Sequence, residues 1–204
     1  LQHYMWNPPY NPNVDAAVHD AWESGYIPVN QAFARSVIEE AKGLDAPPIV
    51  IGHDYHLYLM PEFVRKEVPK ALIQHYIHIP WPTPLYWHMI PNYITRRICE
   101  SLCATDILGF QTPQDRRCFI DTVEEFVPGA AVDRVNYTVD FEGHRSAVKV
   151  YPISINVEEV VAAQIISAPE TAALADSTGR TVSGILPFPL ISEVNFRVWN
   201  WLGL

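Results

Sequence analysis

The sequence predicts an α/β protein built on a Rossmann-like, doubly wound and mostly parallel sheet with a β-hairpin insertion. Short apolar runs alternate with helical segments from residue 48 to residue 127, and such alternation is typical of parallel strands flanked by helices. Right-handed crossovers between the strands then give a doubly wound sheet. Apolar residues make up 49% of the 204 residues and charged residues 18%, which is enough apolar material for a sizeable core.

A long helix is expected before this alternation begins. Asp15 can cap a helix that spans residues 16–42, and Gly25 and Pro28 predict a break within it. Gly43 is the type of residue that ends a helix. Four apolar residues in the second half of this helix follow the spacing of a buried stripe: Val29, Phe33, Val37 and Ile38.

Three strands and three helices are then expected in turn. Their order is a strand at 48–52, a helix at 61–68, a strand at 71–78, a helix at 93–104, a strand at 106–110 and a helix from 112 or 113 to about 127.

The pattern changes to a β-hairpin after the last of these helices. Segments 135–139 and 146–150 flank the pair Glu142-Gly143, which predicts a hairpin turn. The second arm is expected to continue into a further strand over residues 151–155, and a helix is expected at 157–166.

A domain boundary is predicted at residue 166. Residues 1–166 are expected to form one Rossmann-like domain, incomplete at its N-terminus because the chain opens without Met on an apparently internal segment. Residues 167–204 are expected to form an irregular apolar tail, since the alternation of strands and helices stops there. Apolar residues near the end of this tail favour self-association, so a homo-oligomer is possible.

Composition and charge narrow the class of protein. A formal net charge of −9 argues against nucleic-acid binding, which requires a basic face. No apolar run approaches the ~20 residues that span a membrane, and no signal peptide is visible, which predicts a cytoplasmic protein. Cys99, Cys103 and Cys118 are expected to be reduced thiols, with the first two as small core residues on one helix face. A Walker A loop, a glycine-rich dinucleotide fingerprint and a Gly-x-Ser-x-Gly elbow are all missing from the sequence.

Polar side chains follow the three predicted parallel strands. His53-Asp54-Tyr55-His56 follows the first, His78-Ile79-Pro80-Trp81-Pro82 follows the second, and Gln111-Thr112 follows the third. Ligands of doubly wound sheets bind beyond the carboxyl ends of the strands. These residues are therefore expected to meet in one cleft. Carboxylate, imidazole and amide groups suit sugar hydroxyls, and Trp or Tyr rings suit the apolar face of a pyranose.

Each of these residues also has a structural interpretation. Asp54 is either a ligand for sugar hydroxyls or only the N-cap of a helix. His78 precedes a Pro-Trp-Pro turn and is a site candidate, whereas His75 lies within a strand and is expected to be structural. His53 and His56 have the spacing of a metal pair, but without a third ligand they are better explained as packed or capping residues.

Five segments in order resemble motifs of the trehalose-6-phosphate synthase family. They are His3-Tyr4 with Trp22 to Ala34, His53 to Leu57, His78 to Pro82, Asp106 to Thr112, and Tyr151 to Ile155. The resemblance covers roughly residues 1–160, and its strength lies in the order and spacing of the segments.

The resemblance implies one half of a GT-B architecture, in which the active site lies between two Rossmann-like domains. Residues 1–166 would be the acceptor-side domain. Members of this family are retaining hexosyltransferases that transfer glucose from UDP-glucose, or a similar nucleotide sugar, to glucose 6-phosphate and make trehalose 6-phosphate. They need no metal and no other cofactor. The implied partners are therefore a sugar phosphate and a nucleotide sugar.

The resemblance also assigns roles to the residues that match. Tyr4 and Trp22 resemble contacts to the acceptor sugar and its phosphate. Asp54 resembles the carboxylate that binds the acceptor hydroxyls, and His78 resembles the histidine that faces the donor hexose near the reacting centre. Such a site would act by positioning and by stabilising the charge of an oxocarbenium-like state.

Three departures from the family pattern leave alternatives open. The loop after Tyr4 is unusual, and the segment Trp22–Tyr26 is one residue longer than in the family, which favours a related glucosylglycerol-phosphate synthase or pseudo-glycosyltransferase. Leu85 stands where the family has a glutamate. The family's glycine-rich loop and its donor domain are not matched. We therefore expect a fragment that is inactive alone, or a non-catalytic sugar-phosphate-binding module.

Overall fold

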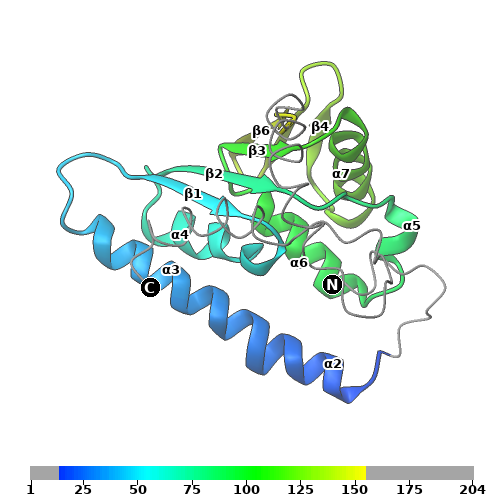
Figure 1. The fold of residues 1–204 in the computed structure, drawn as a ribbon, viewed down its shortest axis with the longest axis horizontal. Helices are drawn as coiled ribbons and strands as arrows, with labels where there is room; N and C mark the ends of the chain where they lie inside the picture. The colour runs from blue at the N-terminus through cyan, green and yellow to red at the C-terminus, as the bar shows by residue number, and fades with distance from the viewer. Residues whose placement is uncertain (1–13, 155–204) are drawn as a thin grey trace, which may run out of the picture. The chain divides into compact units, whose positions relative to one another are not determined.

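A computed structural model describes residues 14–154 of the chain (Figure 1). The chain forms two compact units, residues 1–153 and residues 154–204, and the described residues belong almost entirely to the first. The predicted boundary at residue 166, the helix at 157–166 and the tail lie outside the described residues and stay predictions. None of the described helices is long and apolar enough to cross a membrane.

A six-stranded sheet forms the centre of the first unit, with the strand order β1-β2-β3-β6-β5-β4. The first four strands in this order are parallel, and β5 and β4 complete the sheet in antiparallel fashion. The strands are β1 (Ile49–His53), β2 (Leu72–Ile77), β3 (Ile107–Phe110), β4 (Ala131–Asp133), β5 (Thr138–Phe141) and β6 (His144–Val150). The predicted α/β class and mostly parallel sheet are confirmed.

The described helices pack on one face of this sheet. Their buried side chains meet Val50, Ile73, Leu108 and Val148, which share that face by strand register. The parallel strands follow each other across the sheet without a reversal of order. Because parallel crossovers are right-handed, each helix that connects two of these strands lies on the same face of the sheet. Helices on the opposite face would require the strand order to change direction, and it does not do so within residues 14–154.

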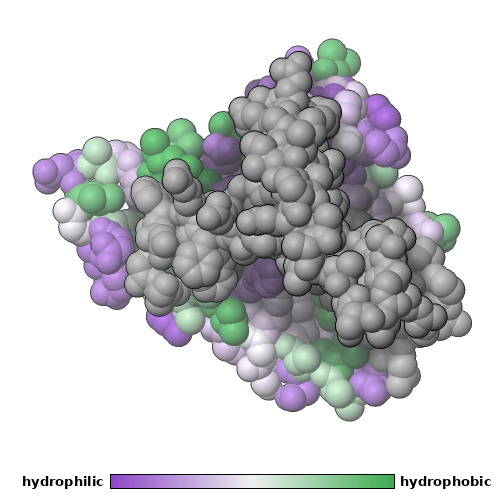
Figure 2. Space-filling view, viewed as in Figure 1, coloured by the Kyte–Doolittle hydropathy of each residue, from purple (hydrophilic) through white to green (hydrophobic). Residues whose placement is uncertain are grey.

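The opposite face of β1 and β2 is apolar and exposed. Ile49 is 69% exposed, Ile51 60% and Leu72 43%. Figure 2 shows apolar surface in the part of the view where β1 and β2 lie. Strand alternation predicts this split, since successive side chains of a strand point to opposite faces.

Four described helices follow the parallel strands; three of them begin within one residue of the predicted positions, and the short α5 was not predicted. They are α4 (Met60–Glu67), α5 (Pro84–Trp87), α6 (Asn92–Leu102) and α7 (Pro113–Phe126). Thr112 caps α7 by accepting a hydrogen bond from the Asp115 backbone N–H at 3.1 Å, and Pro113 occupies the first turn. Cys99, Cys103 and Cys118 are free and buried in the core, as predicted.

The N-terminal helix runs without interruption but changes its type in the middle. It comprises α2 (Ala16–Asp20), a π-helical turn η1 (Ala21–Tyr26) and α3 (Ile27–Ala41). The predicted break near Gly25 is this π-helical turn, and the helix ends with Lys42 as its C-cap.

The predicted buried stripe of this helix is wrong for Val29 and Phe33 and holds in part for Val37 and Ile38, which are half-buried against the core. Val29 is 50% and Phe33 48% exposed, whereas Ile27, Asn30 and Ala34 are buried. The stripe lies wholly within α3, where the buried face follows Ile27, Asn30 and Ala34 at helical spacing and so runs one position away from Val29 and Phe33.

The β5–β6 hairpin is confirmed. Glu142 and Gly143 form its turn with φ angles of 49° and 79°, as a type I′ turn requires. The sequence did not reveal β4, which has only three residues. The further strand expected at 151–155 is wrong over its described part, because β6 ends at Val150 and residues 151–154 are irregular.

Candidate functional site

The carboxyl ends of β1 and β2 bring Asp54, His53 and His78 to one edge of the sheet. Residues His53 and Tyr76 are register partners, so the chain segments that leave the two strands start side by side. The Asp54 backbone N–H extends the ladder by donating to the Tyr76 carbonyl at 2.8 Å. The predicted meeting of strand-end side chains is therefore seen for these two strands.

Asp54 has an unusual backbone. Its φ of 60° and ψ of −179° lie in a region that is essentially restricted to glycine. A residue with a side chain holds such a conformation at a cost of about 1–3 kcal/mol, and only when surrounding contacts enforce it. Strain of this kind gathers at functional sites.

The side chain of Asp54 does not offset this cost. It makes no capping hydrogen bond to the short 3₁₀ turn η2 (Tyr55–Leu57), so the N-cap interpretation does not explain the residue. Its Oδ1 atom is buried and has no hydrogen-bond partner among the residues that the structure describes. A buried carboxylate oxygen without a partner costs free energy, and a hydrogen-bond donor that reaches it would remove this cost.

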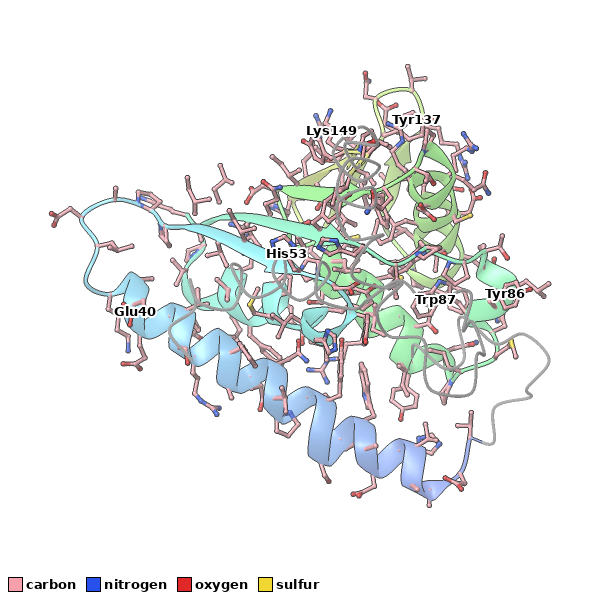
Figure 3. The ribbon with its side chains drawn as sticks, viewed as in Figure 1. Glu40, His53, Tyr86, Trp87, Tyr137 and Lys149 are labelled. Atoms are coloured by element: carbon pink, nitrogen blue, oxygen red, sulfur yellow. The ribbon has the colours of Figure 1, made fainter. Side chains whose placement is uncertain are left out.

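His53 and His78 form a pair beside Asp54. The Nδ1 atom of His53 lies 3.0 Å from Nε2 of His78, and the two rings stack with centroids 5.2 Å apart. The ring of Tyr76 packs edge-to-face against the ring of His78, with centroids 4.7 Å apart. His53 lies at the end of β1 in Figure 3.

His53, interpreted from the sequence as a packed or capping residue, does pack its ring on His78 and Tyr76, but it does so at the exposed strand ends and not in the core. Its ring is exposed and hydrogen-bonded to the site candidate His78. Partial burial, and then the neighbouring His78, lower the pKa of His53, which favours a neutral imidazole. One of the two rings donates the shared hydrogen bond, and this choice fixes the tautomer of both.

His75 is structural, as predicted, and lies directly beneath Asp54. It is fully buried, and its Nε2 atom lies 3.0 Å from the Asp54 carbonyl oxygen. Gly52 makes room for the ring, because a Cβ at this position would lie 2.6 Å from His75 Nδ1. Burial lowers the pKa of His75 to about 4, so the ring is neutral and donates to the carbonyl.

The aromatic ring after β2 is not available as a sugar platform. Trp81 is only 2% exposed and packs against Trp87 and Phe119 at centroid distances of 4.6 and 5.1 Å. Asp115 accepts a hydrogen bond from the Trp81 backbone N–H at 3.0 Å, which anchors the turn that carries His78 to α7. Trp81 therefore holds the site in place from the core.

The third strand end contributes an amide with a structural contact. The Gln111 side-chain oxygen accepts a hydrogen bond from the backbone N–H of Ile153 at 2.9 Å. It thereby ties the segment after β6 to the end of β3. Among residues 14–154, Gln111 makes no hydrogen bond to Asp54 or His78.

Two residues, Tyr4 and Trp22, were predicted to contact the acceptor. Tyr4 lies outside the described residues. Trp22 is 6% exposed in the main core cluster and stacks on Tyr26 with centroids 5.1 Å apart. Its Nε1 atom and the Tyr58 hydroxyl are buried without a hydrogen-bond partner among the described residues. The role of Trp22 as a substrate contact stays a prediction.

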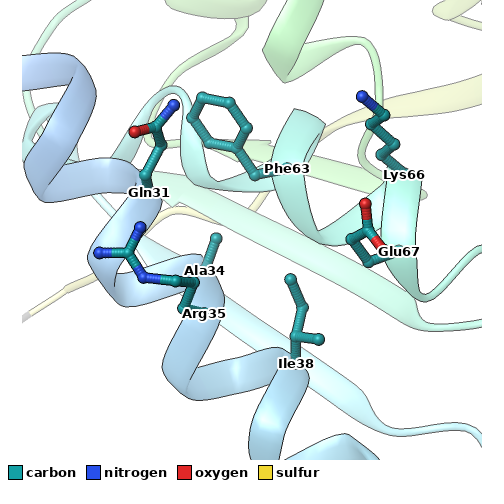
Figure 4. A pocket seen from close by; sticks show the side chains of 7 residues that line it. All are labelled: Gln31, Ala34, Arg35, Ile38, Phe63, Lys66 and Glu67. Atoms are coloured by element: carbon teal, nitrogen blue, oxygen red, sulfur yellow. The ribbon is translucent and has the colours of Figure 1, made fainter.

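Within the described part of the chain, His, Cys, Asp and Glu side chains form no cluster of three or more that could hold a metal ion. A separate groove of about 350 Å³ lies between α3 and α4, away from the strand ends (Figure 4). Its lining combines apolar side chains with Arg35, Lys66 and Glu67, and it includes none of the strand-end residues.

The fold and the strand-end site thus define an α/β domain with a candidate ligand site at the carboxyl ends of parallel strands. The sequence profile described as Glycosyltransferase family 20 matches residues 1–173. The chain belongs to this family.

Relatives include transferases with different substrates. A validamine 7-phosphate valienyltransferase of Streptomyces hygroscopicus subsp. jinggangensis is 28% identical over 150 residues, which cover 74% of this chain and 30% of the relative. A trehalose-6-phosphate synthase of Escherichia coli O1:K1 is 34% identical over 140 residues, 69% of this chain and 28% of the relative. The chain thus spans less than a third of either relative.

Solved structures of the same kind share the fold. The N-terminal domain of a trehalose-6-phosphate phosphatase from Candida albicans matches with a TM-score of 0.64 and 27% identity, covering 80% of this chain and 34% of the other. A trehalose-phosphate synthase from Burkholderia xenovorans in complex with glucose-6-phosphate matches with a TM-score of 0.61 and 28% identity, over 74% of this chain and 31% of the other. An E. coli protein bound with UDP-2-fluoro glucose matches with a TM-score of 0.59 and 26% identity, over 97% and 40%.

Proposed function

We propose that this chain supplies the acceptor side of a retaining hexosyltransferase that transfers glucose from UDP-glucose, or a similar nucleotide sugar, to glucose 6-phosphate. Asp54 binds hydroxyls of the acceptor, and His78 faces the donor hexose. The reaction needs no metal, and the protein works in the cytoplasm, where its buried thiols stay reduced. The family membership and the ligands named for two structural relatives support this proposal.

One observation carries the proposal: Asp54 is a strained residue with a buried and unpaired carboxylate oxygen at the carboxyl end of a parallel strand. A residue that served only the fold would relax its backbone or find a hydrogen-bond donor. A ligand with two adjacent hydroxyl groups gives the carboxylate both partners, and hydrogen bonds to a charged acceptor are stronger than those between neutral groups.

His53 and His78 add a second chemical group at the same edge. The lowered pKa of His53 favours its neutral form, and the pair presents hydrogen-bonding ring nitrogens near the carboxylate. Such a pair orients hydroxyl groups, and it can respond to charge that develops on a neighbouring sugar. Catalysis would then depend on positioning and electrostatic stabilisation and would need no nucleophile from the protein.

A titration with glucose 6-phosphate tests the proposal. We expect the 204-residue chain to bind this ligand weakly, with millimolar ligand shifting the NMR signals of residues around Asp54. Asp54→Asn should weaken binding at least tenfold, because the charged acceptor is lost. Asp45→Asn, an exposed acidic residue before β1, is the matched control and should bind like the unaltered chain. Equal binding by both variants would contradict the role of Asp54.

The valienyltransferase relative favours a second candidate acceptor. That protein is named for a cyclitol phosphate acceptor, and it matches 74% of this chain. A pseudo-glycosyltransferase would use the same carboxylate on a ring of similar shape. Competition between validamine 7-phosphate and glucose 6-phosphate for the chain separates the two, since the true acceptor should bind more tightly.

A non-catalytic sugar-phosphate-binding module is a third candidate. The Candida albicans structure shows that this fold also occurs as the N-terminal domain of a protein named as a phosphatase. Tight binding of glucose 6-phosphate by the 204-residue chain, lost in Asp54→Asn, would favour the module over the transferase.

A further inference from the structure

The strained backbone of Asp54 requires contacts that enforce it. On the strand side, Asp54 N–H bonds the Tyr76 carbonyl and its own carbonyl accepts from His75. These bonds fix one end of the turn. Relaxation at the other end, through Tyr55 and the residues that follow, would still release the strain unless that segment is held as well.

Tyr26 holds the start of this segment. Its hydroxyl donates to the Tyr55 carbonyl and accepts from the Tyr58 backbone N–H at 3.2 Å. Burial raises the pKa of the Tyr26 hydroxyl, so the group keeps the proton that it donates. One side-chain oxygen thereby spans the 3₁₀ turn that follows Asp54.

Asn30 holds the end of the same segment. Its Nδ2 atom donates to the His56 carbonyl at 3.1 Å, and its Oδ1 atom accepts from the backbone N–H groups of Leu59 and Met60 at 3.0 Å each. Asn30 is fully buried and also donates to the Tyr26 carbonyl at 2.9 Å. Two side chains from the N-terminal helix thus hold five backbone groups of the Tyr55–Met60 segment.

The π-helical turn places these two side chains together. Tyr26 is the last residue of η1, and the Ile27 N–H bonds the Trp22 carbonyl five residues back. Removing one residue from this turn would rotate the preceding helix by about 100° relative to α3. Trp22 would then no longer stack on the Tyr26 ring, whose hydroxyl contacts the turn.

We propose that Tyr26 and Asn30 are positioning residues that hold Asp54 in its strained, ligand-ready conformation. The identity of the ligand rests on the proposed function, whereas the mechanical role does not. The π-helical turn serves this role by stacking Trp22 on Tyr26. The turn is therefore part of how the site presents its carboxylate, although no residue of η1 touches that carboxylate by a hydrogen bond.

A double-mutant cycle tests the mechanical role without a ligand. Asp54→Gly relieves the strain and should raise the midpoint of thermal unfolding by about 2–6 °C. Tyr26→Phe keeps the ring and removes the hydroxyl, so the turn can relax. In the Tyr26→Phe background, Asp54→Gly should raise the midpoint of thermal unfolding by less than half of the increase seen in the unaltered chain. Tyr93→Phe is the matched control. Among the described residues its hydroxyl bonds His19 on α2 and no backbone group of the turn, so this variant should leave the gain unchanged.

An equal gain in all three backgrounds would overturn the proposal. Asn30→Asp is a second variant, which keeps the oxygen that accepts from Leu59 and Met60 and loses the donor to His56. It should reduce the gain in the same way. The ¹³Cα and ¹³Cβ shifts of Asp54, which report its backbone conformation, should move in Tyr26→Phe and not in Tyr93→Phe.

Binding of glucose 6-phosphate then separates the two proposals. If the unaltered chain binds it, Tyr26→Phe should weaken binding about tenfold and Tyr93→Phe should not. If the unaltered chain does not bind it, the proposed function fails, and the thermal cycle still decides whether Tyr26 and Asn30 position Asp54.

Discussion

Two aspartates at opposite ends of the same sheet have opposite environments. Asp106, at the amino end of β3, accepts hydrogen bonds from Arg65 Nη2 and from the Ile73 backbone N–H, both at 2.6 Å. Asp54, at the carboxyl end of β1, has a buried oxygen without a described partner and a strained backbone. The first end of the sheet is built for stability, and the second leaves a carboxylate for something that binds.

Positive φ angles show the same contrast. Glu142 has a φ of 49°, but the type I′ hairpin turn explains it and Gly143 shares the cost. Asp54 has a φ of 60° in an open strand-to-turn connection, where no turn type requires it. Side chains from a helix distant in the sequence hold the segment after Asp54. This indicates that the strained conformation serves ligand binding and not the stability of the fold.

The largest expected effect concerns His75, the buried imidazole beneath Asp54. Its pKa is lowered from 6.5 to about 4, so the unfolded chain binds more protons than the folded chain between these pH values. The neutral buried ring therefore leaves the folded state at its full stability above pH 6.5. As the pH falls from 6.5 toward 4, the unfolding free energy decreases by about 3 kcal/mol. Urea unfolding across this range measures it.

A neutral replacement sharpens this prediction. His75→Gln should remove most of the pH dependence, whereas His19→Gln, an exposed residue of α2, should leave it unchanged. An unchanged slope in His75→Gln would show that other groups cause the acid sensitivity.

The next effect compares the two aspartates directly. Asp106→Ala leaves the Arg65 guanidinium and the Ile73 N–H short of an acceptor and should cost about 2–3 kcal/mol, less than a fully buried pair because Asp106 is one-third exposed. Asp54→Asn should change the unfolding free energy by less than about 0.5 kcal/mol, since its carboxylate makes no described bond. Chemical denaturation measures both, and a larger cost at Asp54 would reverse the assignment of the two ends.

The smallest effect concerns two glycines. Gly52→Ala would drive a methyl group against His75 Nδ1, and we expect a loss of about 1–2 kcal/mol with a shift of the Asp54 carbonyl contact. Gly25→Ala meets nothing within 4 Å in the helical turn and should be neutral or stabilise by about 0.5–1 kcal/mol. Denaturation midpoints of the two variants test the contrast, which fails if both behave alike.

Most of the framework could be predicted because its signals are local. The strands β1, β2 and β3 and the helices between them follow apolar periodicity, and the Glu142-Gly143 pair marks the hairpin turn. The errors arose where a non-local event changed the pattern. The polar Asn30 faces the core because it bonds the Leu59 and Met60 backbone, which leaves Val29 and Phe33 at the surface. The three-residue β4 depends on pairing with β5.

The candidate site was predictable in outline and not in detail. Parallel strand ends pointed to Asp54 and His78, whereas His53 was assigned to packing. The register that pairs His53 with Tyr76 brings it to His78, and no pattern along the chain shows a register. The neighbouring ends of β1 and β2 were the only available signal for this pair.

Sequence patterns were sufficient for the fold class, the order of the strands in the chain and the edge of the sheet that carries the candidate site, because burial periodicity and strand direction are properties of short segments. The fate of each carboxylate was decided by tertiary structure. Asp106 meets an arginine 41 positions earlier, and Asp54 is held by Tyr26 and Asn30 across a turn. Hydrogen bonds between distant segments exist only once the chain has folded, and they determine which aspartate is paired and which is left for a ligand.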